Sequence, residues 1–192
     1  MKIGILAWGS LQWDPRTLQI SSDFLSGGPN LPIEFSRISG RTGPIQRLTL
    51  VIDELHGTVC STVVATSSFN DLSQAREDLR GREGMHHVNG VGFINRQTGD
   101  VSFRAMERHP GAVERIRGWL DGTDFDAVIW TALASNFEEV RGEQYSIEAA
   151  LSFLESLSGE GQGIALEYIR RAPTQTQTPL RDAVNQRWAT SG

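Results

Sequence analysis

Residues 57–84 read GTVCSTVVATSSFNDLSQAREDLRGREG, and the pattern of residue types changes halfway along this stretch. Its first half is rich in Val and Thr, whose branched side chains suit the pleated surface of a strand. In its second half, apolar residues recur at helical spacing after Asn70 or Asp71, either of which can cap a first turn. The helix should end near Gly81 or Gly84, since glycine is a common helix stop. The segment therefore predicts a strand followed directly by a helix.

The rest of the chain adds strands first and helices later. Apolar or alternating patterns predict strands at 2–9, 31–40, 47–53 and 126–133, a turn at 41–46, and a strand–turn–strand over 91–103 with its turn at 97–99. Helical patterns cover 110–120, 147–157, 164–172 and 179–188, with a break at Gly159–Gly161. This order does not alternate strand and helix as a doubly wound parallel sheet would.

We therefore expect an α+β fold, in which a mixed β-sheet curls toward a barrel and helices cover its outside. The length of 192 residues suits one domain, which we place at residues 1–171. Residues 172–192 form a polar linker and a short amphipathic helix. That helical C-terminal extension should dock onto the domain or onto a second subunit, so a homo-oligomer through the C-terminal helices is one expectation.

The composition narrows the classes of partner. The net charge is -5 and Lys and Arg do not cluster, so neither nucleic acid nor an anionic membrane is an expected partner. No apolar run reaches the 18 or more residues that a membrane span requires. The chain has one cysteine, Cys60, and no convincing signal peptide, which favours a cytoplasmic protein that binds small molecules.

Two short motifs could hold chemistry. Trp8–Leu11 (WGSL) follows the first predicted strand, and Arg82–Gly84 (REG) ends the predicted helix of residues 57–84. Taken singly, the first is consistent with a simple tight bend and the second with a solvated helix end. The turn also lacks the glycine spacing of a dinucleotide-binding loop, so no NAD is expected.

In this order, and with this strand pattern between them, the two motifs resemble the gamma-glutamylcyclotransferase-like family. That family has an aromatic–Gly–Ser–(Asn or Leu) turn after its first strand and an acidic residue in a Glu–Gly motif, which corresponds to Glu83–Gly84 in this chain. The resemblance covers about residues 2–133. Trp8 stands where the family commonly has Tyr, and Met85–Val88 replaces a frequent Tyr–Arg pair. These differences leave the identity of the substrate open.

The resemblance implies an enzyme that cyclises a γ-glutamyl amide. The α-amine of the substrate attacks its own γ-carbonyl, giving 5-oxoproline and a free amine. Glu83 would serve as general base and then as general acid, and the substrate would lie against Trp8, Gly9, Ser10 and Leu11. The backbone N–H groups of the turn would hold either the developing oxyanion or the α-carboxylate. No cofactor or metal is required, because the attack is intramolecular.

Other interpretations fit the sequence less well. A Ser10 nucleophile with His86 or His87 lacks the G-x-S-x-G elbow, because position 12 is Gln. The four histidines, His56, His86, His87 and His109, match no metal-ligand spacing even with Asp53 included. A different class of function stays open: a non-catalytic ligand-binding or protein-interaction module on the same fold.

Overall fold

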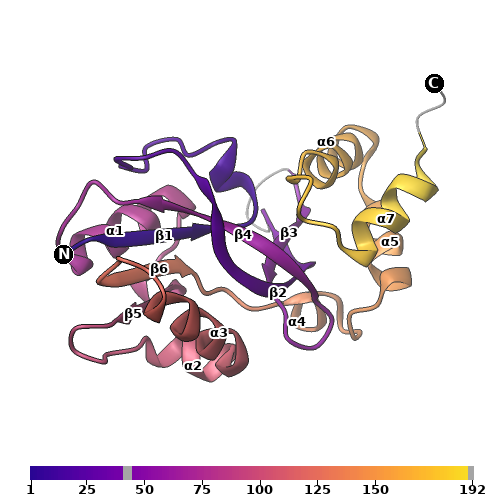
Figure 1. Ribbon diagram of the computed structural model, residues 1–192. Coiled ribbons are helices and arrows are strands. Elements are labelled where there is room, and N and C mark those ends of the chain that lie inside the picture. The colour runs from indigo at the N-terminus through magenta and orange to yellow at the C-terminus, as the bar shows by residue number, and fades with distance from the viewer. Residues whose placement is uncertain (41–44, 190–192) are drawn as a thin grey trace. The chain divides into compact units, whose positions relative to one another are not determined.

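The computed structural model describes residues 1–40 and 45–189 and has an α+β fold (Figure 1). Within these residues six strands form one mixed sheet, in the order β3-β2-β4-β1-β6-β5. The strands are β1 (Ile3–Ala7), β2 (Leu25–Ser39), β3 (Arg47–Ile52), β4 (Thr58–Thr66), β5 (Val91–Asn95) and β6 (Ala127–Thr131). Strand β1 pairs in parallel with β6 and antiparallel with β4. Positions 41–44 of the predicted turn lie outside the described residues.

The sheet is open, which corrects the expectation of a barrel. Strands β3 and β5 stand at its two ends and do not pair with each other. Closure requires every strand to find a neighbour on both sides, with a consistent tilt and stagger. The end strands are short, with six and five residues, and short edge strands are a common way of limiting an exposed edge.

Seven α-helices and two 3-10 turns accompany the sheet among the described residues. They are η1 (Ser10–Gln12), α1 (Leu72–Glu83), η2 (Val88–Gly90), α2 (Phe103–Arg108), α3 (Pro110–Asp121), α4 (Phe137–Arg141), α5 (Ile147–Ser156), α6 (Gly159–Arg170) and α7 (Pro179–Arg187). In the part of the chain that the structure describes, every helix is too short or too polar to cross a membrane.

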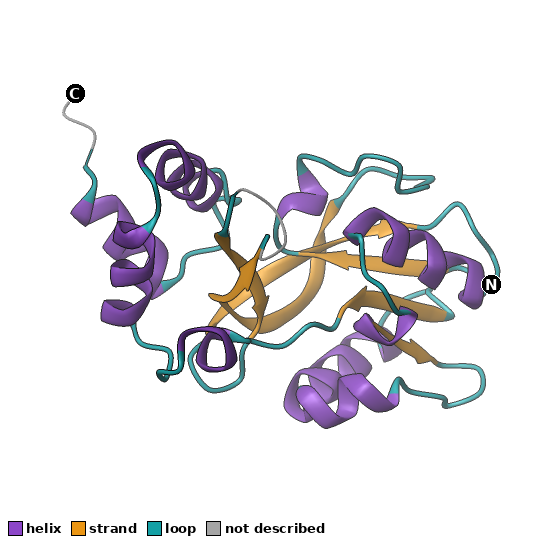
Figure 2. Cartoon of the chain, turned by 180° about the vertical axis from the view of Figure 1, so that it is seen from behind, coloured by secondary structure: helices purple, strands orange, loops and turns teal. Residues whose placement is uncertain are grey.

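The chain divides into two compact units. Unit 1 contains Met1–Leu31 and Ser61–Leu133, and unit 2 contains Pro32–Cys60 and Ala134–Gly192. Helix α7 belongs to the same unit as α5 and α6 and packs against both. The three helices lie together in Figures 1 and 2.

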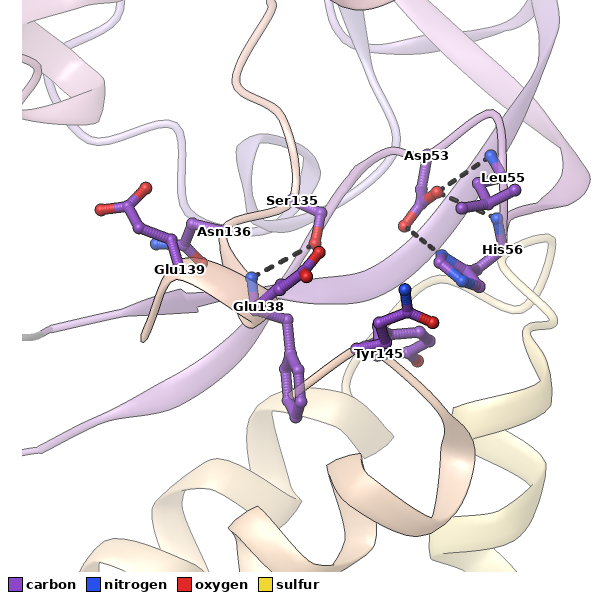
Figure 3. Close-up of a pocket in the computed structure, with 10 residues that line it drawn as sticks. Asp53, Leu55, His56, Ser135, Asn136, Glu138, Glu139 and Tyr145 are labelled. Atoms are coloured by element: carbon purple, nitrogen blue, oxygen red, sulfur yellow. Dashed lines mark hydrogen bonds and ion pairs between the residues drawn. The ribbon is translucent and has the colours of Figure 1, made fainter. Parts of the chain in front are cut away.

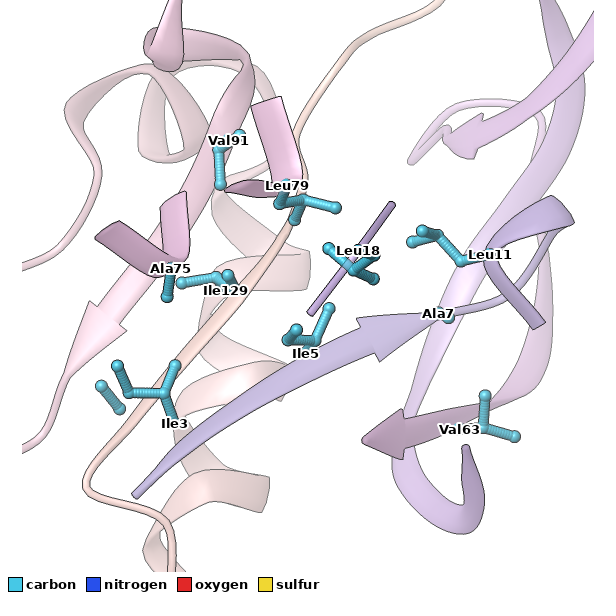
Figure 4. Close-up of a cluster of buried hydrophobic side chains, with 11 residues drawn as sticks. Ile3, Ile5, Ala7, Leu11, Leu18, Val63, Ala75, Leu79, Val91 and Ile129 are labelled. Atoms are coloured by element: carbon cyan, nitrogen blue, oxygen red, sulfur yellow. The ribbon is translucent and has the colours of Figure 1, made fainter. Parts of the chain in front are cut away.

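The core of unit 1 forms around β1 (Figure 4). Ile3 and Ile5 pair in parallel register with Ala127 and Ile129 of β6, and all four are fully buried. Helix α1 adds apolar side chains one turn apart to the same cluster. The complete cluster is Ile3, Ile5, Ala7, Leu11, Leu18, Val63, Ala75, Leu79, Val91, Ala127 and Ile129. Since α1 is fixed on this core, its C-terminal end has a defined position within unit 1.

The second strand predicted within residues 91–103 is wrong. Only an isolated bridge joins Ile94 to Val101, and the chain then enters α2. The side chain of Ser102 accepts a hydrogen bond from the N–H of Ala105 at 3.3 Å, which is the pattern of a helix N-cap. This cap begins a helix where the apolar alternation alone suggested a strand.

The core of unit 2 is lined by helices and aromatic rings. The second half of β2 pairs with β3, so that Ile33 faces Ile52 and Ile38 faces Leu48 across the ladder. Phe137 of α4 packs edge-on against Phe153 of α5, with ring centroids 6.5 Å apart. These contacts join β2 to β3 and α4 to α5 within unit 2.

Glu34 is a fully buried carboxylate that connects β2 to the first turn of α7. It accepts hydrogen bonds from the N–H of Phe35 at 2.7 Å and from the N–H of Leu180 at 3.4 Å, and Thr178 bonds to its side chain. Burial raises its pKa despite these hydrogen bonds. A carboxyl whose pKa is raised on folding stabilises the fold at low pH and loses that contribution as pH rises through the folded pKa.

Glu34→Gln should therefore remove part of the pH dependence of unfolding. Below pH 4.5, the ordinary pKa of this carboxyl, the difference between variant and wild type is a constant offset. Above that pH, the wild type should lose stability relative to the variant, because only the wild type must ionise a buried group. Urea unfolding between about pH 4 and pH 8 measures the difference. Parallel stability curves for the two proteins would contradict the assignment.

Arg181 is a buried cation of unit 2 and is 8% exposed. Its Nη1 donates to the carbonyls of Pro173 and Thr176 at 2.7 and 2.8 Å. Its Nη2 donates to the carbonyls of Arg170 and Ala172 at 3.1 and 2.6 Å. One guanidinium of α7 thus bonds to the last residue of α6, where the helix dipole favours a cation, and to the segment that leads from α6 to α7.

Candidate functional site

The predicted binding turn is a 3-10 turn that follows β1 directly. The N–H of Gln12 donates to the carbonyl of Gly9 at 3.1 Å, and the N–H of Asp14 donates to the carbonyl of Ser10 at 2.8 Å. Trp8 and Leu11 are buried, whereas Gly9 and Ser10 are partly exposed. The four predicted residues therefore divide into two that pack inward and two that reach the surface of unit 1.

Glu83 is the last residue of α1. Ala75, Leu79 and Arg82 share the buried face of the helix, and Gly84 ends it in the left-handed conformation, with φ 64°. Glu83 therefore comes one residue after the buried face, and its side chain is 21% exposed. The carboxylate is partly sheltered but open to solvent.

Arg82 brings the two predicted motifs together. Its guanidinium is 2% exposed, and Nη1 lies 2.7 Å from Oε1 of Glu83. Its Nη2 donates to Oγ of Ser10 at 3.4 Å and to the carbonyl of Asp14. One buried cation thus contacts both the turn after β1 and the carboxylate at the end of α1. The sequence motif contained Arg82, but its spacing gave no sign of this bridging position.

The residues gathered around Arg82 have a limited chemistry. Glu83 offers a carboxylate that can accept and return a proton, and Ser10 offers a hydroxyl. The turn offers the N–H groups of Gly9, Ser10 and Leu11, for which the first turn of a helix contains no acceptor. Within residues 1–40 and 45–189, no three His, Cys, Asp or Glu side chains gather as metal ligands would.

Unit 2 contains a pocket that the sequence motifs did not indicate (Figure 3). Its volume is about 570 Å³, and its lining includes Asp53, His56, Phe137 and Tyr145. Oδ1 of Asp53 accepts hydrogen bonds from the N–H groups of Leu55 and His56 at 3.1 and 2.9 Å. Its Oδ2 lies 3.4 Å from Nδ1 of His56. The sequence suggested no role for Asp53 and His56 beyond a set of metal ligands, and nothing local connects them with Tyr145.

Gly57 makes the turn after Asp53 possible. A Cβ on Gly57 would collide with the carbonyl oxygen of Asp53 and would lie 2.7 Å from the backbone nitrogen of Ile33. Its own N–H donates to that carbonyl of Asp53 at 2.9 Å. The absence of a side chain at Gly57 therefore allows the tight turn that places His56 beside Asp53.

Two pKa shifts mark this pocket. Burial disfavours the ionised form of Asp53, but the nearby hydroxyl of Ser36 and the hydrogen bonds from the N–H groups of His56 and Leu55 outweigh it and lower its pKa. Burial, followed by the charges of Glu34 and Asp53, raises the pKa of Tyr145. Asp53 is thus a carboxylate at neutral pH, and Tyr145 keeps its hydroxyl proton.

In comparisons with known proteins, no family model, no curated protein and no solved structure matches this chain.

Proposed function

We propose that the chain is a gamma-glutamylcyclotransferase-like enzyme whose active site is the Gly9–Leu11 turn together with Glu83. The observation that carries the proposal is the bridge through Arg82, which contacts Ser10 and Glu83 at the same time. A purely solvated Glu83 would have had no connection with the turn. The two motifs that resemble the family thus lie beside each other within unit 1, as a shared site requires.

The proposed reaction moves two protons from the α-nitrogen to the leaving nitrogen and exchanges one C–N bond for another. Glu83 accepts a proton from the α-ammonium group of the substrate, and the freed amine attacks the γ-carbonyl carbon to form a C–N bond. The C–N bond to the leaving amine then breaks, and Glu83 returns this proton to the leaving nitrogen, while the second proton of the attacking nitrogen passes to the released amine, which leaves as an ammonium ion. The products are 5-oxoproline and an amine, and no oxidant or second substrate is consumed.

The residues around Glu83 have separate roles in this scheme. Arg82 positions the carboxylate through Oε1, so the second oxygen can face the substrate amine. The N–H groups of Gly9, Ser10 and Leu11 hold the oxyanion or the α-carboxylate, since both are anions that suit a row of backbone donors. Trp8 and Leu11 are buried, so they act by shaping the turn rather than by touching much of the substrate. Such a protein would work in the cytoplasm on a free small molecule.

The test is release of 5-oxoproline from a panel of γ-glutamyl amines and γ-glutamyl peptides. We expect release from at least one member, at a rate that scales with enzyme concentration and disappears after heat inactivation of the protein. A panel that differs only in the leaving amine also identifies the substrate class. If no member releases 5-oxoproline, the enzyme proposal fails and the ligand-binding module becomes the better account.

A further inference from the structure

The pocket of unit 2 is lined by acidic side chains, both exposed and buried. Glu138 and Glu139 are exposed lining residues at the start of α4, and Asp53 is a buried one. Lys and Arg are missing from the lining formed by the described residues. A volume of about 570 Å³ lies in the range of small-molecule sites. The charge of the pocket therefore favours a cationic occupant.

Several polar groups of the pocket are already used by the fold. Asn136 accepts from the N–H of Ile38 at 2.8 Å and donates to the carbonyl of Ile38 at 3.1 Å. Ser135 donates to the carbonyl of Ser36 at 2.7 Å. These two side chains fix the segment that leads into α4, so they have little capacity left for a ligand.

Tyr145 is different, because its hydroxyl is buried without a hydrogen-bond partner in the described part of the chain. The residue is 7% exposed and lines the pocket beside His56, with ring centroids 5.1 Å apart (Figure 3). A buried hydroxyl that makes no hydrogen bond destabilises a fold, so such groups call for an explanation. A ligand that enters the pocket and bonds to this hydroxyl would supply one.

The aromatic rings complete the description of the occupant. Phe137 packs edge-on against Tyr145, with centroids 5.3 Å apart, and both rings line the pocket. Ring faces attract cations and also shelter apolar groups. The pocket thus combines a buried carboxylate, an unpartnered hydroxyl and an apolar wall.

We propose that this pocket binds a small organic cation, a protonated amine with an apolar stem, through Asp53 and the hydroxyl of Tyr145. The ammonium group donates to the carboxylate of Asp53 and to the oxygen of Tyr145, while the stem lies against the exposed lining residue Leu55. The contact between Asp53 and Nδ1 of His56 fixes the carboxylate for this purpose. The inference rests on unit 2 alone and does not depend on the cyclotransferase proposal.

Calorimetric titration of the full chain with 2-phenylethylamine tests the proposal, with 2-phenylethanol as the neutral comparison. We expect the amine to bind at least about tenfold more tightly than the alcohol, as a charge-assisted hydrogen bond would give. Asp53→Asn should weaken amine binding about tenfold or more, and Tyr145→Phe by about three- to tenfold. Glu148→Gln removes an exposed charge outside the pocket lining and should leave the affinity unchanged.

The Tyr145→Phe variant keeps the test decisive if Asp53→Asn fails to fold. It retains the ring and removes only an unpartnered hydroxyl, so its thermal midpoint should match or exceed that of the wild type. Equal affinity for amine and alcohol would overturn the proposal, as would unchanged amine affinity in Tyr145→Phe and in folded Asp53→Asn. Amine binding that weakens equally in Glu148→Gln would show a nonspecific charge effect and would overturn it too.

Discussion

Arg181→Met is expected to lower the free energy of unfolding of the chain by about 3–5 kcal/mol, a large effect for one substitution. Methionine preserves most of the length of the side chain but donates no hydrogen bond. Four carbonyls, those of Arg170 at the end of α6 and of Ala172, Pro173 and Thr176 in the segment that follows, would then lose their shared donor. The carbonyl of Pro173 keeps a second donor, the N–H of Thr176 at 2.9 Å. Each buried carbonyl left unpartnered costs about 1–3 kcal/mol before the structure relaxes.

Arg187→Met is the matched control for this prediction, because it makes the same change on the same helix. Arg187 is 60% exposed and pairs with Glu155 on the surface. An exposed ion pair contributes about 0–1 kcal/mol, so the control should unfold close to the wild type. Urea titration followed by circular dichroism measures both variants. Equal losses in the two variants would show that Arg181 does not stabilise the end of α6 through its four hydrogen bonds.

Glu83→Gln is expected to lower the turnover number for 5-oxoproline release by about 100- to 10,000-fold, the usual contribution of a general acid–base group. Glutamine has nearly the size of glutamate and can still accept a hydrogen bond from Arg82, but it cannot take up the proton of the substrate amine. The loss should therefore appear in the turnover number more than in substrate affinity.

Glu77→Gln is the control for charge and position on α1. Glu77 is 54% exposed and pairs with Arg80, away from the Ser10 turn. Its activity should stay within about twofold of the wild type, as for a surface substitution outside the site. If Glu83→Gln retains wild-type turnover, the reaction proceeds without Glu83 and the proposed acid–base mechanism is wrong.

The strand and helix within residues 57–84 could be predicted because their signals are local. Asp71 accepts a hydrogen bond from the N–H of Gln74 at 2.9 Å, as an N-cap does, and Gly84 ends the helix in a conformation that glycine adopts readily. The Val and Thr residues that lie between Gly57 and the helix mark the strand. Such local preferences agree with the fold and therefore gave the correct elements.

The break predicted at Gly159–Gly161 exists but lies about two residues earlier, between Ser156, where α5 ends, and Gly159, where α6 begins. Helix α6 begins at Gly159 and includes both glycines, although glycine weakens helices. Ala165, Leu166 and Ile169 bury one face of this helix, and tertiary burial of that kind outweighs a weak local preference. Helix α4 also escaped prediction, since five residues give too short a pattern to recognise.

The candidate sites illustrate what a single sequence leaves out. Glu83 and the turn were identified as motifs, but the bridge between them through Arg82 depends on where α1 packs on the core of unit 1. Likewise, Asp53 and His56 are neighbours in a turn, whereas Tyr145 reaches them only through the packing of unit 2. The spacing of these residues along the chain therefore predicts neither arrangement.

The most direct test of the central claim is the identity of the product formed in water enriched in the heavy oxygen isotope. The substrate is a γ-glutamyl amine that the panel has shown to react, and the products are analysed by mass spectrometry. Intramolecular attack predicts 5-oxoproline without the heavy isotope, because no water enters the reaction. Glutamate that has incorporated the heavy isotope would instead reveal hydrolysis and would contradict the cyclotransferase assignment.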